Sequence, residues 1–262
     1  MLIQIDPIIF SIGPLQIRWY ALMYVISFFV GGYLLKYLAK HGLSLLPKEK
    51  IDSSITYAII GMFLGSRLTY VFVYNWDYYS QNLMDIIMIQ KGGLSYHGAI
   101  FGMAMSLILF GRKNKIPPLH MLDIVCVAGA QGLFFGRLGN FINGELYGRI
   151  SDVPWAMIFP GGGPYPRHPS QLYQSLLEGL ALFLIMWWQK KRLVTGGQLT
   201  GIYLVGYGFF RFIVEFFREA DSQLGYYFGN SITMGQILCC LMMIAGLMFI
   251  WYSKKKKTAI QL

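Results

Sequence analysis

Long apolar stretches separated by short polar segments dominate the pattern of the 262-residue chain. A helix that crosses the ~30 Å hydrocarbon core of a bilayer needs roughly 20 mainly apolar residues. Seven stretches meet this requirement, and the third, fourth and sixth carry the most polar residues. They are 17–38, 51–74, 93–111, 119–138, 169–189, 199–217 and 231–252. The pattern predicts an all-α integral membrane protein with about seven transmembrane helices and a small outer loop region.

The composition supports this prediction, because 55% of the residues are hydrophobic and only 13% are charged. A soluble domain of this length would lack the polar side chains to cover its apolar surface. Tryptophan and tyrosine lie near the ends of the apolar stretches, as at Trp19-Tyr20 and Trp251-Tyr252. Such positions are typical of the aromatic belts at membrane interfaces. We therefore expect membrane lipids to surround the chain.

Basic residues indicate the direction of the helices. Lysine and arginine follow the first, third, fifth and seventh stretches, within 36–50, 112–115, 190–192 and 254–257. If seven helices alternate in direction, these clusters fall on one side, which the positive-inside rule assigns to the cytoplasm. The N-terminus is then outside and the C-terminus cytoplasmic. The same distribution explains the formal net charge of +10, so we expect no nucleic-acid partner.

This orientation brings five polar side chains into the outer half of the predicted bundle. Three arginines occur in outward-running stretches, and a histidine and a tyrosine occur near the outer ends of inward-running ones: Arg67, Arg137, Arg211, His97 and Tyr20. An arginine inside a membrane costs at least ~2.5–3.5 kcal/mol. Repeating that cost at one depth indicates a bound anion, and a lipid phosphate matches the planar fork of arginine.

Each of these residues also has a structural explanation. The Arg67 side chain can reach the interface, and Arg211 can pair with Glu215 four residues later on the same helix face. Tyr20 can belong to the aromatic belt, and His97 can be a buried histidine with a satisfied hydrogen bond. Asp123 and Glu178 lie within apolar stretches, where we interpret them as interhelical hydrogen-bonding partners.

The densest polar segment is 136–149, with the sequence G-R-L-G-N-F-I-N-G-E-L-Y-G-R. Its four glycines allow backbone amides to approach a ligand, while Arg137, Asn140, Asn143 and Glu145 supply a cation, amides and a candidate base. The structural alternative is a re-entrant turn that lines a polar cavity. We expect a single transmembrane catalytic domain over 1–262, with 139–168 as an outer glycine-rich loop within it.

The cysteines do not suggest a metal site. Cys126, Cys239 and Cys240 all lie inside apolar stretches, without a C-x-x-C pattern or clustered histidines. We interpret them as small apolar side chains and expect neither a metal nor a cofactor.

The polar motifs resemble those of the prolipoprotein diacylglyceryl transferase family. The segment 136–149 resembles the signature of that family. The resemblance extends in matching order through 8–24, 92–98, 167–173, 206–218 and 231–236. Two positions depart from the family pattern: His97-Gly98-Ala99 replaces the usual His-Gly-Gly, and Gln174 stands where a glutamate is common.

The resemblance implies an enzyme of the bacterial inner membrane. Its lipid donor is phosphatidylglycerol, and its acceptor is the lipobox cysteine of a pre-lipoprotein. The product is a thioether, and glycerol phosphate leaves. The resemblance places functional weight on Tyr20, His97, Arg137, Asn140, Glu145, Gly148, Arg211 and Glu215.

The chemistry of this reaction suggests roles for these residues. A thiol of pKa ~8.5 must become a thiolate before it attacks carbon. His97 is a candidate base or relay, and Glu145 and Tyr20 are alternatives. Arg137 and Arg211 are candidates to stabilise the leaving phosphate. Asn140, Asn143, Gly148, Glu215 and Arg67 are candidate substrate-binding residues.

A transporter for anions or lipids, with an arginine-lined cavity, is the alternative function. Such a protein predicts charges spread through the membrane depth, whereas these charges gather in one half of the bundle. The sequence therefore favours the enzyme.

Overall fold

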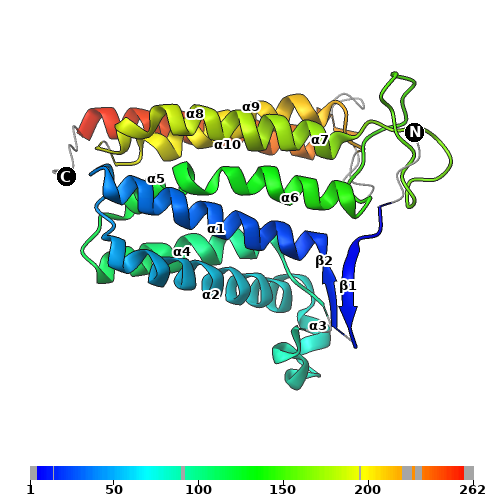
Figure 1. Cartoon of the computed structure of the whole chain (residues 1–262), viewed down its shortest axis with the longest axis horizontal. Coiled ribbons are helices and arrows are strands. Elements are labelled where there is room, and N and C mark those ends of the chain that lie inside the picture. Colours follow the sequence, from blue (N-terminus) through cyan, green and yellow to red (C-terminus); the bar gives the residue numbers. More distant parts are fainter. Residues whose placement is uncertain are drawn as a thin grey trace. The chain divides into compact units, whose positions relative to one another are not determined.

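The computed structural model describes residues 5–13, 15–89, 92–194, 196–219, 226–227 and 232–256, and these residues are mostly helical (Figure 1). The longer helices are α1 (Trp19–Lys40), α2 (Ile51–Thr69), α4 (Tyr96–Lys113), α5 (Pro118–Gly129), α6 (Gln131–Ile142), α9 (Gln198–Glu215) and α10 (Met234–Lys256). The short helices are α3 (Trp76–Tyr79), α7 (Ser170–Gln174) and α8 (Leu182–Trp188). The 3-10 turns are η1 (Lys48–Lys50), η3 (Leu83–Ile87) and η6 (Gln189–Val194), and the π-helical turns are η2 (Tyr70–Tyr74) and η5 (Ser175–Ala181).

Each predicted apolar stretch is helical over most of its length. The fourth stretch is divided at Ala130, where α5 and α6 meet at a bend of 45°. The fifth is one helical run in which the π-helical turn η5 joins α7 to α8. Ser231, where the seventh stretch was predicted to begin, lies outside the described residues.

Among the described residues, three helical runs are long and apolar enough to cross a membrane: Trp19–Lys40, Lys48–Tyr74 and Met234–Lys255. The bent pair α5–α6 makes a fourth if it counts as one span. Large apolar side chains stand exposed on these helices, for example Phe29 and Leu241. Such exposure suits helices that face lipid. The count of seven spans stays a prediction.

In the part of the chain that the structure describes, two antiparallel strand pairs accompany the helices, and the all-α prediction did not include them. Strand β1 (Ile8–Ile12) pairs with β2 (Leu15–Arg18). The pair β3 (Tyr226–Tyr227) and β4 (Ile232–Thr233) directly precedes α10. Because β2 continues to Arg18, α1 begins at Trp19, two residues after the start of the predicted stretch. Short strands of this kind carry only a weak periodic signal in sequence.

The described chain divides into two compact units. One unit contains the described residues of 1–35 and 123–261, and the other contains 36–122. We describe each unit by itself.

Glycines allow α2 and α4 to pack closely in the second unit, where the two helices run side by side (Figure 1). Gly61 and Gly65 are four residues apart on α2, and Gly98 and Gly102 are four apart on α4. A Cβ atom at Gly65 would lie 2.6 Å from the Cα of Gly102. Small residues at this spacing let two helix backbones approach within the membrane.

An acidic side chain joins two helices in the first unit. Asp123 of α5 is fully buried, and its carboxylate accepts hydrogen bonds from the backbone N–H groups of Gly197 and Thr200, both at 2.7 Å. The Thr200 hydroxyl donates a third hydrogen bond at 2.6 Å. These bonds satisfy free amides at the start of α9. The interpretation of Asp123 as an interhelical hydrogen-bonding partner is confirmed.

We predict that Gly65→Ala lowers the melting temperature in detergent, because the added methyl group overpacks the α2–α4 contact at a cost of about 1–3 kcal/mol. The matched control is Gly136→Ala on α6, where a Cβ atom meets nothing within 4 Å. Alanine there gains helix propensity and should melt at or above the wild-type temperature. A Gly65→Ala variant as stable as this control would contradict the close helix contact.

Candidate functional site

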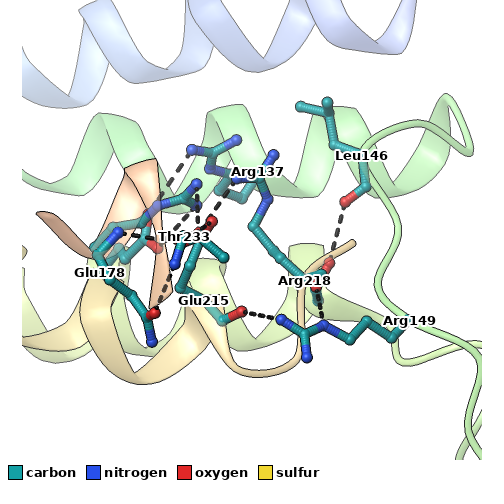
Figure 2. A network of polar contacts seen from close by, with 10 residues as sticks. Arg137, Leu146, Arg149, Glu178, Glu215, Arg218 and Thr233 are labelled. Carbon is teal, nitrogen blue, oxygen red and sulfur yellow. Dashed lines mark hydrogen bonds and ion pairs between the residues drawn. The ribbon is translucent and has the colours of Figure 1, made fainter. Parts of the chain in front are cut away.

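Arginine and glutamate side chains alternate in a continuous row in the first unit (Figure 2). Glu178, on the π-helical turn η5, lies 3.7 Å from Nη2 of Arg137 on α6 and 3.5 Å from Nη1 of Arg211 on α9. Glu215, at the end of α9, lies 3.0 Å from Nη2 of Arg211 and 3.3 Å from Nη1 of Arg218. We call these five residues the arginine–glutamate row.

The row is largely buried. The side chains of Arg137, Arg211 and Arg218 are 17%, 14% and 12% exposed, and that of Glu178 is fully buried. Buried ion pairs are stable only when attraction and hydrogen bonds offset the desolvation of both charges. Within the row, Glu178 lies between the guanidiniums of Arg137 and Arg211, and Glu215 lies between those of Arg211 and Arg218. Guanidiniums held in this way have the planar fork that binds the oxygens of a phosphodiester.

The helix geometry accounts for the position of the two carboxylates. Arg211 and Glu215 are four residues apart on α9, so they share one face of that helix. The ion pair between them, which the sequence indicated, is confirmed. Glu178 lies on a π-helical turn, a local geometry that is frequent at functional sites.

The start of α10 supports the row from a third direction. The hydroxyl of Thr233 donates to Oε1 of Glu215 at 3.2 Å. The same threonine caps α10, because the Gln236 N–H donates to its hydroxyl at 3.2 Å. The Gln236 side chain in return accepts from the Thr233 N–H at 3.1 Å. This reciprocal capping box fixes where α10 begins.

The glycine-rich segment connects to the row through Asn140. Its Oδ1 accepts a long hydrogen bond of 3.5 Å from Nη1 of Arg137, and its Nδ2 donates to Oε1 of Glu145 at 2.8 Å. Asn143 donates to the same Glu145 oxygen at 3.2 Å. Four of the predicted site residues thus form one hydrogen-bonded group.

The backbone after α6 turns sharply and is held by α7. Gly144 and Leu146 have φ angles of +67° and +58°, and a positive φ is unusual for leucine. The Ser170 hydroxyl donates to the Leu146 carbonyl at 3.1 Å, and the Gln171 amide donates to the Glu145 carbonyl at 2.7 Å. These two bonds oppose the strain and fix the direction of the Glu145 side chain.

Gly148 and Arg149 attach the segment to the end of α9. The Gly148 N–H donates to the His168 carbonyl at 2.9 Å, and a Cβ atom at Gly148 would lie 2.8 Å from that oxygen. Arg149 Nε donates to the Arg218 carbonyl at 2.6 Å. A side chain at position 148 therefore has no room without a backbone shift, and the structure places Gly148 in a packing role.

His168 lies in the loop before α7 and contacts aromatic side chains. Its Nδ1 is 3.1 Å from the Tyr173 hydroxyl, and its ring packs edge-on against Phe217. Burial lowers the pKa of the His168 imidazole, and the nearby Asp152 carboxylate opposes this shift. His168 is therefore mainly neutral at pH 7.

Tyr20 lies in the first turn of α1 and packs against α6. Its hydroxyl lies 3.1 Å from that of Tyr24, and a Cβ atom at Gly139 would lie 2.8 Å from the Tyr20 ring. Gly139 therefore makes room for Tyr20, one residue before Asn140. Among the described residues, no three His, Cys, Asp or Glu side chains are grouped to hold a metal ion.

His97 and Arg67 belong to the second unit, so their predicted convergence with the arginines of the first unit stays a prediction. His97 is exposed in the first turn of α4, whose N-cap is Ser95. The structure gives its ring no hydrogen bond to another described residue.

Arg67 is buried, and its guanidinium donates to backbone carbonyls of the segment 85–93. The shortest of these bonds reach Asp85 at 2.5 Å, Gly92 at 2.6 Å and Ile86 at 2.8 Å. This set of carbonyls accounts for the buried charge and gives Arg67 a role in holding the loop.

Sequence reasoning missed Glu178, Arg218 and Thr233 as members of the site. Glu178 was interpreted as an interhelical hydrogen-bonding partner; it does contact two other helices, through ion pairs with Arg137 and Arg211, but its place in the site was not predicted. An ionisable residue in the middle of an apolar stretch is itself a sign of function, and that signal would have identified it. Arg218 follows Glu215 by three residues, the spacing of neighbours on one helix face.

Comparisons with known proteins agree on one family. A model of the prolipoprotein diacylglyceryl transferase family matches residues 7–252. The phosphatidylglycerol–prolipoprotein diacylglyceryl transferase of Pseudoalteromonas translucida is 45% identical over 260 residues, which cover 98% of this chain and 97% of that protein. Its counterpart in Mannheimia succiniciproducens is 43% identical, covering 98% and 96%. That of Nitratidesulfovibrio vulgaris is 45% identical, covering 93% of each. This chain belongs to the prolipoprotein diacylglyceryl transferase family.

Proposed function

We propose that this protein transfers the diacylglyceryl group of phosphatidylglycerol to the lipobox cysteine of bacterial pre-lipoproteins. The names of its relatives support both substrates. The observation that carries the proposal is the arginine–glutamate row, in which Glu178 and Glu215 hold the largely buried guanidiniums of Arg137 and Arg211 in place. The phosphodiester of phosphatidylglycerol has one negative charge and oxygen acceptors suited to the arginine fork.

In the proposed reaction the cysteine sulfur attacks the carbon of the diacylglyceryl group that is bonded to the phosphate ester oxygen. A carbon–sulfur bond forms, and the carbon–oxygen bond breaks. Glycerol phosphate leaves with the electron pair. Negative charge grows on the phosphate oxygens in the transition state. Arg137 and Arg211 stabilise that charge because Glu178 and Glu215 already hold their guanidiniums in place.

The thiol proton has to be removed before the attack. His97 is our proposed base or relay, because it is exposed at the start of α4 and histidine exchanges protons near neutral pH. Glu145 and Tyr20 are the alternatives. Asn140, Asn143 and Glu215 orient the charged groups around the lipid, whereas Gly148 and Arg67 act through the packing described above.

We also propose a single catalytic domain with seven spans in the bacterial inner membrane. The N-terminus is outside, the C-terminus is cytoplasmic, and the segment 139–168 is an outer loop. The distribution of lysine and arginine supports this orientation. The transporter alternative has no support from the names of the relatives, which are transferases.

Mass spectrometry of a lipobox peptide, incubated with purified protein and phosphatidylglycerol, tests the proposed function. The peptide should gain one diacylglyceryl group, and a peptide with serine in place of cysteine should stay unmodified. We predict that Arg137→Ala and Arg211→Ala each lower turnover by at least ~100-fold, the scale of losing one donor to a developing charge. Lysine at either position should restore activity only in part, because it keeps the charge but loses the fork.

Arg112→Ala is the control for these variants, since Arg112 is exposed at the end of α4. It should retain wild-type turnover. Near-normal turnover by both alanine variants, at normal levels of inserted protein, would contradict the phosphate site.

His97→Gln tests the proposed base. If His97 deprotonates the thiol, this variant should insert and melt like the wild type but transfer slowly at pH 7. Its rate should recover as the pH approaches the ~8.5 of a free thiol, because hydroxide then supplies the thiolate. The pH–rate profiles of both proteins give the answer. Wild-type turnover at pH 7 would remove His97 from catalysis, and a lower melting temperature without recovery at high pH would indicate a packing role.

Cysteine labelling tests the orientation, in a background where Cys126, Cys239 and Cys240 are replaced by alanine. Single cysteines at Asp77 and Tyr165, which are exposed, should react with a membrane-impermeant reagent from outside intact cells. Single cysteines at Lys113 and Lys191 should react only after the membrane is opened. The reverse pattern would overturn the orientation and the argument that the arginines share one depth.

A further inference from the structure

Three polar side chains on one helical run are fully buried, and most of their polar atoms make no hydrogen bond to a described residue, although the Glu178 oxygens are in ion pairs with Arg137 and Arg211. They are Gln171 and Gln174 on α7 and Glu178 on η5, and each has 0% exposure. Oε1 of Gln171, both amide atoms of Gln174 and both carboxylate oxygens of Glu178 make no hydrogen bond to a described residue. Leaving one buried polar atom unsatisfied already costs free energy, and most buried polar groups avoid it.

Such unsatisfied atoms gather at this site. Six described residues hold buried side-chain atoms of this kind. Asn143 contacts Glu145, and Arg211 contacts Glu178, so both join the three residues above. Gln131 is the exception, and its own Nε2 donates to the Ser27 carbonyl at 2.9 Å. The clustering of these unsatisfied atoms at one site indicates that a polar ligand completes their hydrogen bonds.

The helix spacing places Gln174 between the two ends of the candidate site. Residues 171, 174 and 178 are separated by three and four positions, so they share one helix face. Gln171 contacts the Glu145 carbonyl at one end, and Glu178 contacts Arg137 and Arg211 at the other. Because residues 175–181 form a π-helical turn, Gln174 lies about one helical turn from Glu178. A group attached by one ester bond to a phosphate on the arginines spans such a distance.

We propose that Gln171, Gln174 and Glu178 bind the hydroxyl groups of the polyol headgroup that is esterified to the lipid phosphate, with Gln174 as the residue that selects this headgroup. This inference rests on the proposed function and names the part of the donor lipid that Gln171, Gln174 and Glu178 bind. A hydroxyl both donates and accepts, so it satisfies the Gln174 N–H groups as well as the amide and carboxylate oxygens. An ammonium headgroup only donates, and it leaves the Gln174 N–H groups unpaired.

The test compares the affinities of the purified protein for two short-chain lipids with the same acyl groups. Phosphatidylglycerol carries the glycerol headgroup, and phosphatidic acid carries the phosphate alone. We expect Gln174→Met, which keeps the length of the side chain, to weaken phosphatidylglycerol binding about tenfold and to leave phosphatidic acid binding unchanged. Gln174→Glu retains oxygen acceptors for the hydroxyls and should keep a preference for phosphatidylglycerol. The matched control Gln131→Met should leave the ratio of the two affinities at its wild-type value.

Equal loss of both lipids in Gln174→Met would overturn the inference, since it indicates general damage. Three other results would also overturn it. The first is a Gln174→Met variant whose ratio of the two affinities equals the wild-type ratio, and the second is a wild-type protein that binds the two lipids equally. The third is a Gln174→Glu variant that no longer prefers phosphatidylglycerol. If the Gln174→Met variant does not insert into the membrane, the preference of Gln174→Glu for phosphatidylglycerol over phosphatidic acid is the test. Binding needs no acceptor peptide and no turnover. A wild-type protein that prefers phosphatidylglycerol but modifies no lipobox peptide would therefore refute the proposed function and leave this inference standing.

Discussion

The cost of burying charge in a helical membrane protein is the constraint on which the rest of the site depends. Arg137, Arg211 and Arg218 are each less than one-fifth exposed, and such a position is costly for an arginine unless nearby acceptors satisfy its guanidinium. Glu178 and Glu215 supply two carboxylates that pair with these guanidiniums. The carboxylates also keep the guanidiniums in position before the lipid arrives. Little reorganisation is then needed as charge develops on the phosphate.

The surrounding elements serve to hold this row. Thr233 supports Glu215 from the capped start of α10, and Asp123 caps the start of α9, which carries Arg211. The segment after α6 is held in a strained turn by Ser170 and Gln171, so Glu145 meets Asn140. Each of these supports is a hydrogen bond to a backbone group or a carboxylate, the kind of partner that is strong where water is scarce.

Much of this arrangement could be predicted from the sequence, for physical reasons. Apolar stretches of about twenty residues determine where the helices lie, because the hydrocarbon core has a fixed thickness. The four-residue spacing of Arg211 and Glu215 determines their ion pair. The strand pair β1–β2 was not predicted, because a short hairpin leaves little periodic signal. The partners of Glu178 were also missed. Which helices face each other is a tertiary property, and spacing along one helix does not reveal it.

The partners of Arg67 also could not be predicted from the sequence. Its position in an apolar stretch indicated an anion site, yet its guanidinium donates to carbonyls of a loop about twenty residues further along the chain. A buried arginine therefore indicates a cluster of acceptors, and only the fold tells whether those acceptors belong to the protein or to a ligand.

An experimental structure with bound phosphatidylglycerol tests the phosphate site most directly. We expect phosphate oxygens within hydrogen-bonding distance, about 2.7–3.2 Å, of the guanidinium nitrogens of Arg137 and Arg211. Glu178 should remain beside both arginines. A phosphate bound elsewhere, with the arginine–glutamate row intact and closed to lipid, would contradict the phosphate site.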